Sequence, residues 1–265
     1  MVFAEMLRVW NICLTFGGMK RLMIYLLVAM CAVSSRAAGA SVFVGESINY
    51  DIVYHWGLIW KHAASATMTF GEHGTNYRAM LTARTVSWAH SLFPLHDTLT
   101  CVMKPDLRPI KYVKATHENK YEATDVVRFS YNGSTVKGEC SQEHDGNVER
   151  KTLTSTGPTF DMLSVFYNLR SLKLGSMKKG DTEKMTIFSG TEKETLKIRY
   201  VGVERVELRD GSTRIGHHIQ FTFTSDNGKE SSTPINAWLS TDAAHIPLLL
   251  VGKVRIGEVR CYFHP

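Results

Sequence analysis

The sequence predicts a mainly β protein, in which an antiparallel meander forms a curved sheet or a partly open β-barrel with one packed α-helix. Apolar and polar residues alternate along most of the chain after residue 45, which is the pattern of half-buried strands. Turn dipeptides recur about every 8 to 15 residues, as in antiparallel sheets and barrels. One segment, residues 158–175, departs from this alternation and has the period of a helix instead.

The composition is that of a globular protein with a hydrophobic core. Of the 265 residues, 44% are hydrophobic and 21% are charged, which are ordinary values for a folded chain and argue against disorder. The sequence contains no repeat, low-complexity tract or linker. We therefore expect residues 41–265 to form a single β-rich domain.

We interpret residues 1–40 as an N-terminal extension followed by a cleavable signal peptide that forms a helix. Lys20 and Arg21 are a basic start, residues 22–33 are an apolar run, and residues 38–40 are a small-x-small cleavage site. Met19 directly precedes the basic pair, so we expect it to be the true start of translation. The sequence thus predicts export.

Two alternatives remain open for this segment. An apolar run that is never cut would anchor the chain in a membrane, although it is shorter than the roughly 20 residues of a confident span. Cys31 would carry a lipid if it were the cleavage site of a lipoprotein signal, but the preceding Met30 is larger than usual there. We expect cleavage before Ser41 and no transmembrane span afterwards.

The net charge indicates which partners to expect, and the cysteine spacing indicates whether a metal site or disulfides are expected. Residues 41–265 contain 27 basic and 24 acidic residues, a net charge of +3, and no basic run, so we expect no nucleic-acid partner. Cys101, Cys140 and Cys261 fit no zinc spacing. In an oxidising compartment they allow at most one disulfide, and we expect them to act mainly as buried small hydrophobic residues.

Strands are predicted in order along the chain, separated by turns. Asn132-Gly133, Asp145-Gly146, Asp210-Gly211 and Asn227-Gly228 favour tight turns because these residue types accept positive φ. An apolar stretch without a clean period, residues 88–95, is expected to be a loop over the barrel mouth or a docking patch. The predicted strand segments are 46–56, 58–70, 77–85, 97–103, 110–120, 126–131, 136–140, 185–188, 196–203, 205–208, 215–223, 235–239, 246–254 and 259–263.

The helix is predicted over Pro158–Gly175. Thr156 or Thr159 is expected to cap it, Pro158 suits its first turn and Gly175 ends it. A helix of about 15 residues with one apolar stripe is marginal alone in water, so it needs an apolar surface such as the concave face of the sheet. The stripe consists of Met162, Leu163, Phe166, Leu169 and Leu172.

Three segments resemble a known family. Residues 160–170 (FDMLSVFYNLR), residues 237–259 (AWLSTDAAHIPLLLVGKVRIGEV) and residues 45–60 (GESINYDIVYHWGLIW) look like characteristic segments of the domain-of-unknown-function 3108 family of exported bacterial proteins. His245 stands where an Arg is usual. The residues that match the family motifs are Asp161, Leu163, Ser164, Tyr167, Arg170, Trp238, Ser240, Asp242, Pro247 and Gly257.

The resemblance implies an envelope protein with a curved antiparallel sheet, similar in general character to lipoprotein and lipid carriers. It implies the periplasm or the outer-membrane periphery of a Gram-negative bacterium, and it implies no established activity. We interpret six of the matching residues as a structural motif: Asp161, Ser164, Arg170, Ser240, Asp242 and Pro247.

The two charged residues of the predicted helix are not expected to form an ion pair with each other. Asp161 and Arg170 are nine residues apart and face roughly opposite sides of the predicted helix. Arg170 is expected either to pair with a carboxylate on the sheet or to end the helix in solvent.

No residue pattern points to catalysis or to a metal, and we expect no cofactor. His217 and His218 are neighbours on a predicted strand, so their side chains point to opposite faces and cannot share a metal ion. Ser240, Asp242 and His245 have the residue types of a catalytic triad, but they lie within one predicted turn, which rarely provides the relay geometry. We expect them to order the turn.

The aromatic residues are the remaining candidates for binding. Five of them are predicted to face one interior, where they either fill a core or line a ligand cavity under the helix. They are Trp60, Phe166, Tyr167, Phe221 and Trp238.

Three functions follow as hypotheses. The leading one is a non-enzymatic envelope protein that binds a lipid or other hydrophobic ligand between the curved sheet and the helix. The first alternative is an assembly or scaffolding protein that contacts envelope proteins through residues 88–95. The second alternative is a hydrolase that uses His245 or another histidine.

Overall fold

The computed structural model describes residues 40–265, except residues 92, 229, 231–232 and 255. The predicted signal segment, the start at Met19 and the lipid alternative at Cys31 lie outside the described residues.

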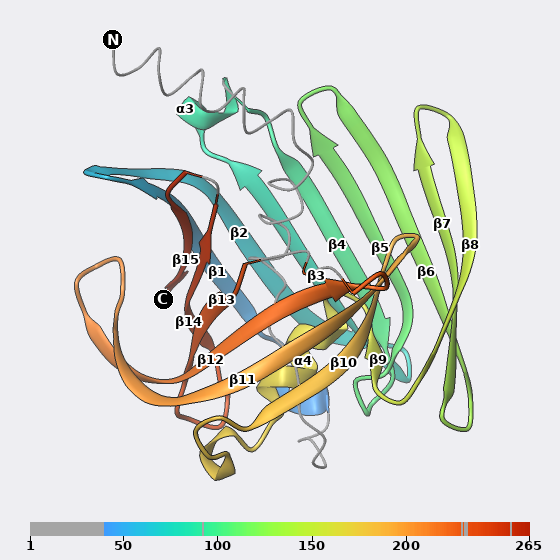
Figure 1. The fold of residues 1–265 in the computed structure, drawn as a ribbon. Coiled ribbons are helices and arrows are strands. Elements are labelled where there is room, and N and C mark those ends of the chain that lie inside the picture. The colour runs from blue at the N-terminus through green and yellow to red at the C-terminus, as the bar shows by residue number, and fades with distance from the viewer. Residues whose placement is uncertain (1–39, 92, 229, 231–232, 255) are drawn as a thin grey trace.

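Within the described residues, fifteen strands form one continuous sheet that curls into a nearly closed barrel (Figure 1). The spatial order is β8-β7-β6-β5-β4-β3-β2-β1-β15-β14-β13-β12-β11-β10-β9, and every pair is antiparallel except β9 with β10. The predicted antiparallel meander with one packed helix is confirmed. The strands are β1 (Ser47–Trp56), β2 (Ile59–His73), β3 (Asn76–Thr85), β4 (His96–Met103), β5 (Pro109–Glu118), β6 (Tyr121–Asn132), β7 (Thr135–His144), β8 (Asn147–Thr156), β9 (Thr159–Phe160), β10 (Thr182–Ser189), β11 (Glu192–Glu207), β12 (Thr213–Ser225), β13 (Ile235–Ser240), β14 (Pro247–Lys253) and β15 (Glu258–His264).

Alternation and turn chemistry explain most of this sheet. Along β4, for example, every second residue is buried and those between are partly exposed, as expected for a strand with one face on a core. The predicted Asp145-Gly146 turn joins β7 to β8, and the turn after Asn132 consists of Gly133 and Ser134; Gly133 and Gly146 adopt positive φ there. The predicted Asp210-Gly211 and Asn227-Gly228 turns lie in longer connections. The predicted break near residue 204 is absent, because β11 runs through it after an irregularity between Tyr200 and Gly202.

The helix is shorter than predicted. α4 spans Ser164–Arg170, whereas Thr159 and Phe160 form β9 and pair with Thr186 and Ile187 of β10. Parallel pairing with a neighbouring strand therefore replaces the first predicted helical turns. The other helical segments are η1 (Ala40–Phe43), α3 (Ser87–His90) and η2 (Leu174–Ser176).

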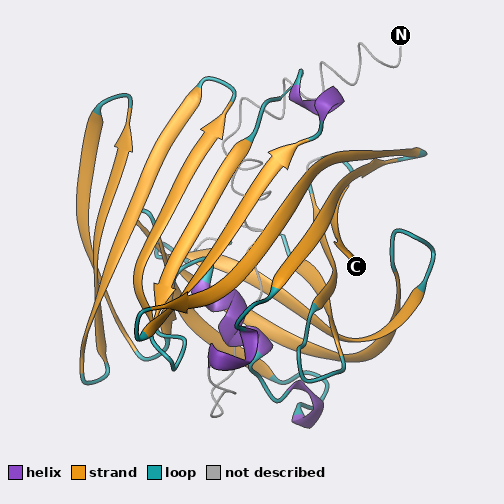
Figure 2. Cartoon of the chain, turned by 180° about the vertical axis from the view of Figure 1, so that it is seen from behind, coloured by secondary structure: helices purple, strands orange, loops and turns teal. Residues whose placement is uncertain are grey.

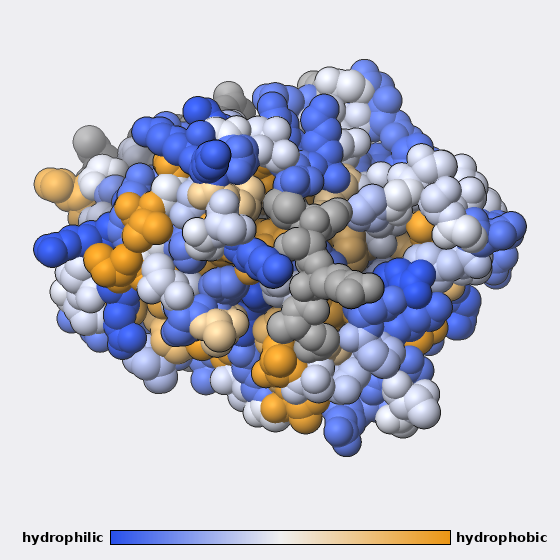
Figure 3. All heavy atoms as spheres, turned by 90° about the horizontal axis from the view of Figure 1, so that it is seen from below, coloured by the Kyte–Doolittle hydropathy of each residue, from blue (hydrophilic) through white to orange (hydrophobic). Residues whose placement is uncertain are grey.

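The predicted stripe of the helix is nevertheless buried. α4 lies inside the curve of the sheet near one end of the barrel (Figure 2), and Met162, Leu163, Phe166, Leu169 and Leu172 all belong to the main hydrophobic core. The core around the helix is filled by side chains from most strands of the barrel. At this end the surface shows apolar residues between polar ones (Figure 3).

Residues 88–95 do not form the surface patch that the sequence suggested. Phe93 and Leu95 are buried, and Ala89 in α3 is buried as well. Trp88 is 38% exposed, and its Nε1 donates to the carbonyl oxygen of His62. The described residues Ala89, Phe93 and Leu95 of this run thus face inward, whereas Trp88 stays partly exposed. No helix among the described residues is long and apolar enough to cross a membrane.

An aromatic contact across the barrel brings β10 against β6 and β7. The ring of Phe188 stacks on Phe129, with centroids 5.8 Å apart and an interplanar angle of 11°. Phe188 also covers Gly138 of β7, where a Cβ atom would lie 2.6 Å from its Cδ2 atom. A side chain at this position would therefore have to displace the Phe188 ring.

We predict that Gly138→Ala lowers the free energy of unfolding by about 1–3 kcal/mol, because the added methyl group overlaps the buried Phe188 ring. The matched control is Gly71→Ala in β2, where a Cβ atom meets nothing within 4 Å. That control should be neutral or gain about 0.5 kcal/mol from reduced backbone entropy. Urea denaturation measures the free energy of unfolding of both variants. Equal values would show that the close contact between Gly138 and Phe188 does not limit the size of the side chain there.

Candidate functional site

Asp161 fixes the start of α4 from inside the core. Its Oδ1 accepts the backbone N–H groups of Leu163 (2.8 Å) and Ser164 (2.9 Å). Its Oδ2 accepts the hydroxyl of Ser164 (2.8 Å) and the thiol of Cys101 (3.0 Å). Burial raises the pKa of Asp161 despite these hydrogen bonds. Asp161 thus orders the first turn of α4 from two residues before its N-cap, Leu163, and the expected caps Thr156 and Thr159 are wrong, because Thr156 belongs to β8 and Thr159 to β9.

Arg170, itself buried, fixes the other end of α4 with a partly buried ion pair. Its Nη1 and Nη2 atoms each lie 2.5 Å from a carboxylate oxygen of Glu46, directly before β1. Its Nε and Nη2 atoms also donate to the carbonyl oxygen of Ala244 (3.1 and 3.0 Å). The guanidinium carbon lies 4.7 Å from the centroid of Phe43. Of the two alternatives for Arg170, the structure contains the ion pair, and Asp161 and Arg170 do not pair with each other.

The segment before β14 closes around the same helix end. Asp242 Oδ1 accepts the hydroxyl of Ser240 (2.9 Å) and the N–H of Ala244 (2.9 Å), and Ile246 N–H donates to Ser240 Oγ (2.8 Å). Pro247 then begins β14. The structural-motif residues of both family segments therefore lie at the two ends of α4.

His245 binds the helix and not Ser240. Its Nδ1 donates to the carbonyl oxygen of Arg170 (2.8 Å). Since the described hydrogen bonds of Ser240 go to Asp242 and Ile246, these residues have no nucleophile-to-base relay. Among the described residues, no three His, Cys, Asp or Glu side chains gather so that they could hold a metal ion.

The five predicted ligand-binding aromatic residues do not share one interior. Phe166, Tyr167 and Phe221 lie in the main core, at most 1% exposed. Trp238 lies on the opposite face of β13, where it stacks on His218 and its Nε1 donates to Glu204. Trp60 is 47% exposed on the outer face of β2. A shared interior is therefore wrong for Trp60 and Trp238.

A β-bulge explains the error at Trp60. Ile52 of β1 pairs with Ala64, but the next residue, Val53, pairs with His62, so Ala63 is skipped. The extra residue shifts the side-chain alternation of β2. Ala64 therefore points into the core, whereas His62 and Trp60 point outward.

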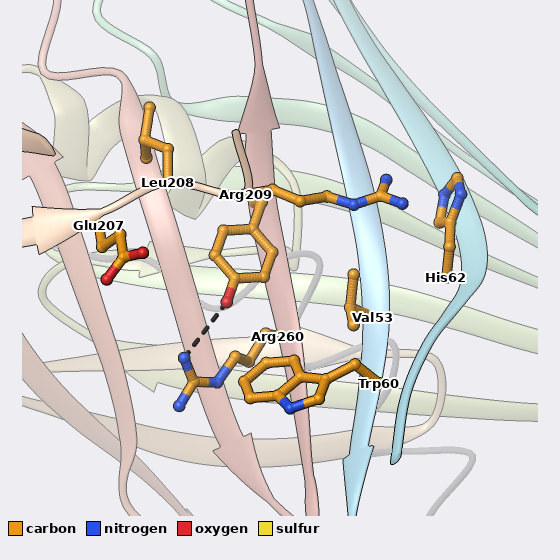
Figure 4. A pocket seen from close by; sticks show the side chains of 8 residues that line it. Val53, Trp60, His62, Glu207, Leu208, Arg209 and Arg260 are labelled. Atoms are coloured by element: carbon orange, nitrogen blue, oxygen red, sulfur yellow. Dashed lines mark hydrogen bonds between the residues drawn. The ribbon is translucent and has the colours of Figure 1, made fainter. Parts of the chain in front are cut away.

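On that outer face lies a groove, which we call the outer groove. It has a volume of about 510 Å³ and lies between strands β1, β2 and β15 and the turn that joins β11 to β12 (Figure 4). Its lining combines aromatic, aliphatic and cationic side chains. The lining residues are Val53, Trp60, His62, Glu207, Leu208, Arg209, Arg260 and Tyr262.

Two interactions hold the β11–β12 turn against the sheet. Val206 and Leu208 pack with Val53 and Tyr262 in a second hydrophobic cluster, separate from the main core. Beside it, Arg209 Nη1 donates to Asp51 Oδ2 at 2.5 Å. The turn itself follows from the predicted Asp210-Gly211 pair, since Gly211 has φ +81°.

Asp51 is the acidic residue that holds the β11–β12 turn. Its Oδ2 also lies 3.1 Å from His264 Nδ1, and its Oδ1 lies 3.2 Å from His62 Nε2. Burial raises the pKa of Asp51, but the hydrogen bonds from His264 and Arg209 outweigh it, and the pKa lies below its usual value. The carboxylate therefore stays ionised at neutral pH.

Trp60 forms one wall of the outer groove and is held from two sides. The His55 ring stacks on it with centroids 3.6 Å apart, and the Arg260 guanidinium carbon lies 4.9 Å from its centroid. Glu258 contacts both neighbours, at 3.0 Å from His55 and 2.6 Å from Arg260. The sequence gives no local signal for this wall, because outward-facing charged residues look like any solvated strand face.

A comparison of the sequence with family models decides the family. The model described as "Protein of unknown function (DUF3108)" matches residues 49–263. The chain belongs to the DUF3108 family. This match agrees with the resemblance of residues 160–170 and 237–259, and the DUF3108 domain spans all fifteen strands except the first residues of β1 and the last residue of β15.

A solved structure shares the fold of this DUF3108 chain. It is described as the crystal structure of a β-barrel-like protein of the domain of unknown function DUF1849 from Brucella abortus. The similarity has a TM-score of 0.57 with 12% sequence identity, and covers 82% of this chain and 94% of that chain. At this identity the comparison supports the fold alone. No curated protein matches the DUF3108 chain.

We predict that Glu46→Gln lowers the free energy of unfolding by roughly 3 kcal/mol, because it leaves the Arg170 charge buried without a counter-charge. The matched control is Glu139→Gln, which breaks an exposed pair with Lys137 and should cost at most about 0.5 kcal/mol. Denaturant titration measures both variants. A loss of unfolding free energy for Glu46→Gln as small as that of the control would contradict the stabilising role of the Glu46–Arg170 ion pair.

We predict that the cysteines are inert in the native protein. Cys101, Cys140 and Cys261 are free and buried. Burial raises the pKa of Cys140 to about 11 and that of Cys261 to about 12, and it also raises the pKa of Cys101. At about pH 8 a disulfide reagent such as Ellman's should react with none of them before unfolding and with all three afterwards.

The control for this experiment is Ser134→Cys in the exposed β6–β7 turn, which should react at once. Because the folded-state pKa values are raised, the unfolded chain ionises first as the pH rises above about 8.5, so the free energy of unfolding should fall there. Rapid reaction of native wild-type protein would contradict the burial of these thiols.

Proposed function

We propose that this DUF3108 protein is an exported, non-enzymatic envelope protein that binds a lipid or similar hydrophobic molecule in the outer groove. The observation that carries the proposal is the groove itself, a hollow in which the half-exposed Trp60 is the main apolar surface and which His62, Arg209 and Arg260 also line. Its volume of about 510 Å³ lies within the range of small-molecule sites. A half-exposed tryptophan held in place by its neighbours is a typical binding surface.

The groove suits a ligand better than the interface between helix and sheet. Leu163, Phe166 and Leu169 are at most 1% exposed and belong to the main core. A ligand beneath α4 would have to displace these side chains, which costs packing energy at each one. The outer groove is already open to solvent and needs no such displacement.

Two observations support a binding role without catalysis. The hydroxyl of Ser240 and the ring of His245 are used to hold the segment beside α4. The three buried thiols have raised pKa values, which makes them poor nucleophiles. The burial of Phe93 and Leu95 argues against the assembly alternative, since it leaves Trp88 as the exposed apolar side chain among the described residues of 88–95. Export to the periplasm or outer-membrane periphery rests on the sequence of residues 19–40.

The test is lipid extraction followed by mass spectrometry on protein purified from the native envelope. We expect wild-type protein to carry a hydrophobic molecule and Trp60→Ala to lose most of it, since the substitution removes the aromatic wall. The control is Val148→Ala, which removes an exposed apolar side chain of β8 outside the groove. Wild-type protein recovered without any such molecule, or equal loading of Trp60→Ala, would overturn the proposal.

A further inference from the structure

We propose that the end of the β11–β12 hairpin, residues 205–215, is a strap that opens as a unit and uncovers an apolar floor for the chain of a hydrophobic ligand. The place of the ligand rests on the proposed function, whereas the opening itself does not. Figure 1 shows this end of the hairpin at the left of the barrel, beyond β13. Its turn borders the outer groove, to which Leu208 and Arg209 contribute (Figure 4).

The strap has no neighbouring strand among the described residues. The pairing of β12 with β13 ends at Gly216 and Ser240, and β10 pairs with β11 only as far as Arg199. Over residues 205–215, β11 and β12 pair only with each other. The backbone N–H of Leu208 donates to Ser212, within the same hairpin. Since a two-stranded hairpin is at best marginally stable by itself in water, the strap depends on its side-chain contacts with the barrel.

A glycine lies in each strand at the base of the strap. In β11 the ladder to β12 is irregular between Tyr200 and Gly202, and Gly202 has φ +143°. A Cβ atom at Gly202 would meet nothing within 4 Å, so no side chain packs against this point. In β12, Gly216 pairs with Glu204. Because the irregularity interrupts the ladder and glycine accepts the widest range of backbone conformations, we expect the hairpin to bend at this base.

Val206, Leu208 and Arg209 hold the strap closed. Val206 and Leu208 pack in the second hydrophobic cluster, and Arg209 donates to Asp51. The side chain of Arg209 is 42% exposed, so this ion pair contributes little to closure because solvent screens it. Opening the strap breaks these contacts and leaves the main core intact. It therefore costs less than making room for a ligand beneath α4, where core side chains would have to move.

Beneath the strap, the outer faces of β1, β14 and β15 are apolar. Val53, Leu248, Leu249 and Tyr262 are at most 6% exposed and pack with the strap in the second hydrophobic cluster. While the strap is closed these side chains are nearly inaccessible, and Trp60 is the main apolar surface of the outer groove. An open strap would expose them beside Trp60, where the burial of apolar area favours an aliphatic chain. The floor thus extends the outer groove for a longer ligand.

Hydrogen exchange of the purified mature protein, measured by mass spectrometry without ligand, tests the opening. After correction for intrinsic rates, we expect the amides of residues 205–215 to exchange at least about a hundredfold faster than those of β4 and β5, which report global unfolding. Exchange of the strap should also depend little on urea below the unfolding transition, because a local opening exposes little surface. Strap amides that exchange at the rate of β4 and β5, with the same urea dependence, would overturn the strap.

Two substitutions separate the strap from the core. Leu208→Ala should speed the exchange of the strap at least about tenfold, because its packing is lost when the strap opens. Ile187→Val, in β10 and the main core, should speed the exchange of β4 and β5 about two- to tenfold. It should leave the strap unchanged, because its contacts persist in the open form. An effect of Ile187→Val on the strap as large as on β4 and β5 would overturn independent opening.

Calorimetry tests the place of the ligand, with monododecanoylglycerol below its aggregation concentration as the probe and glycerol as the probe without a chain. If the chain binds the open form, the apparent affinity rises with the fraction of protein that is open. Arg209→Gln should therefore bind monododecanoylglycerol more tightly, by the same factor as its strap exchanges faster, up to about fivefold. The matched control is Arg214→Gln, an exposed arginine of the same hairpin outside the groove, which should change neither quantity.

The outcomes separate the strap from the proposed function. Faster exchange of the strap in Arg209→Gln with unchanged affinity would overturn the place of the chain beneath the strap, while the proposed function stands. A strap that opens independently in a protein that binds no monododecanoylglycerol would overturn the proposed function and leave the strap. Binding without independent opening would overturn the strap alone. Equal increases of exchange and affinity in Arg209→Gln, absent from Arg214→Gln, would support the whole inference.

Discussion

A buried guanidinium at the end of α4 is the constraint on which the arrangement of the barrel depends. Arg170 lies in the core and would be costly there without a partner. Its partner Glu46 is 124 positions earlier in the sequence, and its second acceptor is the carbonyl oxygen of Ala244. One side chain thus connects the start of β1, the helix and the segment that leads into β14. The structural-motif residues of the two family segments therefore lie at the two ends of α4.

The inner and outer faces of the sheet serve different purposes. The inner face is filled by the apolar stripe of α4 and by residues from most strands, so it provides stability and leaves little reason to assign it a ligand. The outer face at β1, β2 and β15 is covered only in part, by the β11–β12 turn. The gap that this partial cover leaves is lined by fixed aromatic and cationic groups, which is why we assign binding to it.

Much of the fold could be predicted because strand alternation and turn chemistry act over a few residues. The antiparallel meander, the turns at Asn132-Gly133 and Asp145-Gly146 and the buried stripe of the helix were all predictable. The length of the helix was not, because Thr159 and Phe160 pair with β10, a contact that local periodicity does not encode. The groove was also not predictable, because its two sides are far apart in the sequence and Asp51 and Arg209 are 158 positions apart.

The sequence by itself determined which residues alternate, where the chain turns and that one apolar helix needs a surface to cover it. These properties depend on side-chain chemistry within a few residues. Only the tertiary structure decided that Trp60 faces outward, that Arg170 pairs with Glu46 and that the β11–β12 turn folds onto β1. A bulge of one residue reverses a strand face, and an ion pair needs two distant segments to meet. Both depend on contacts that form when the barrel closes.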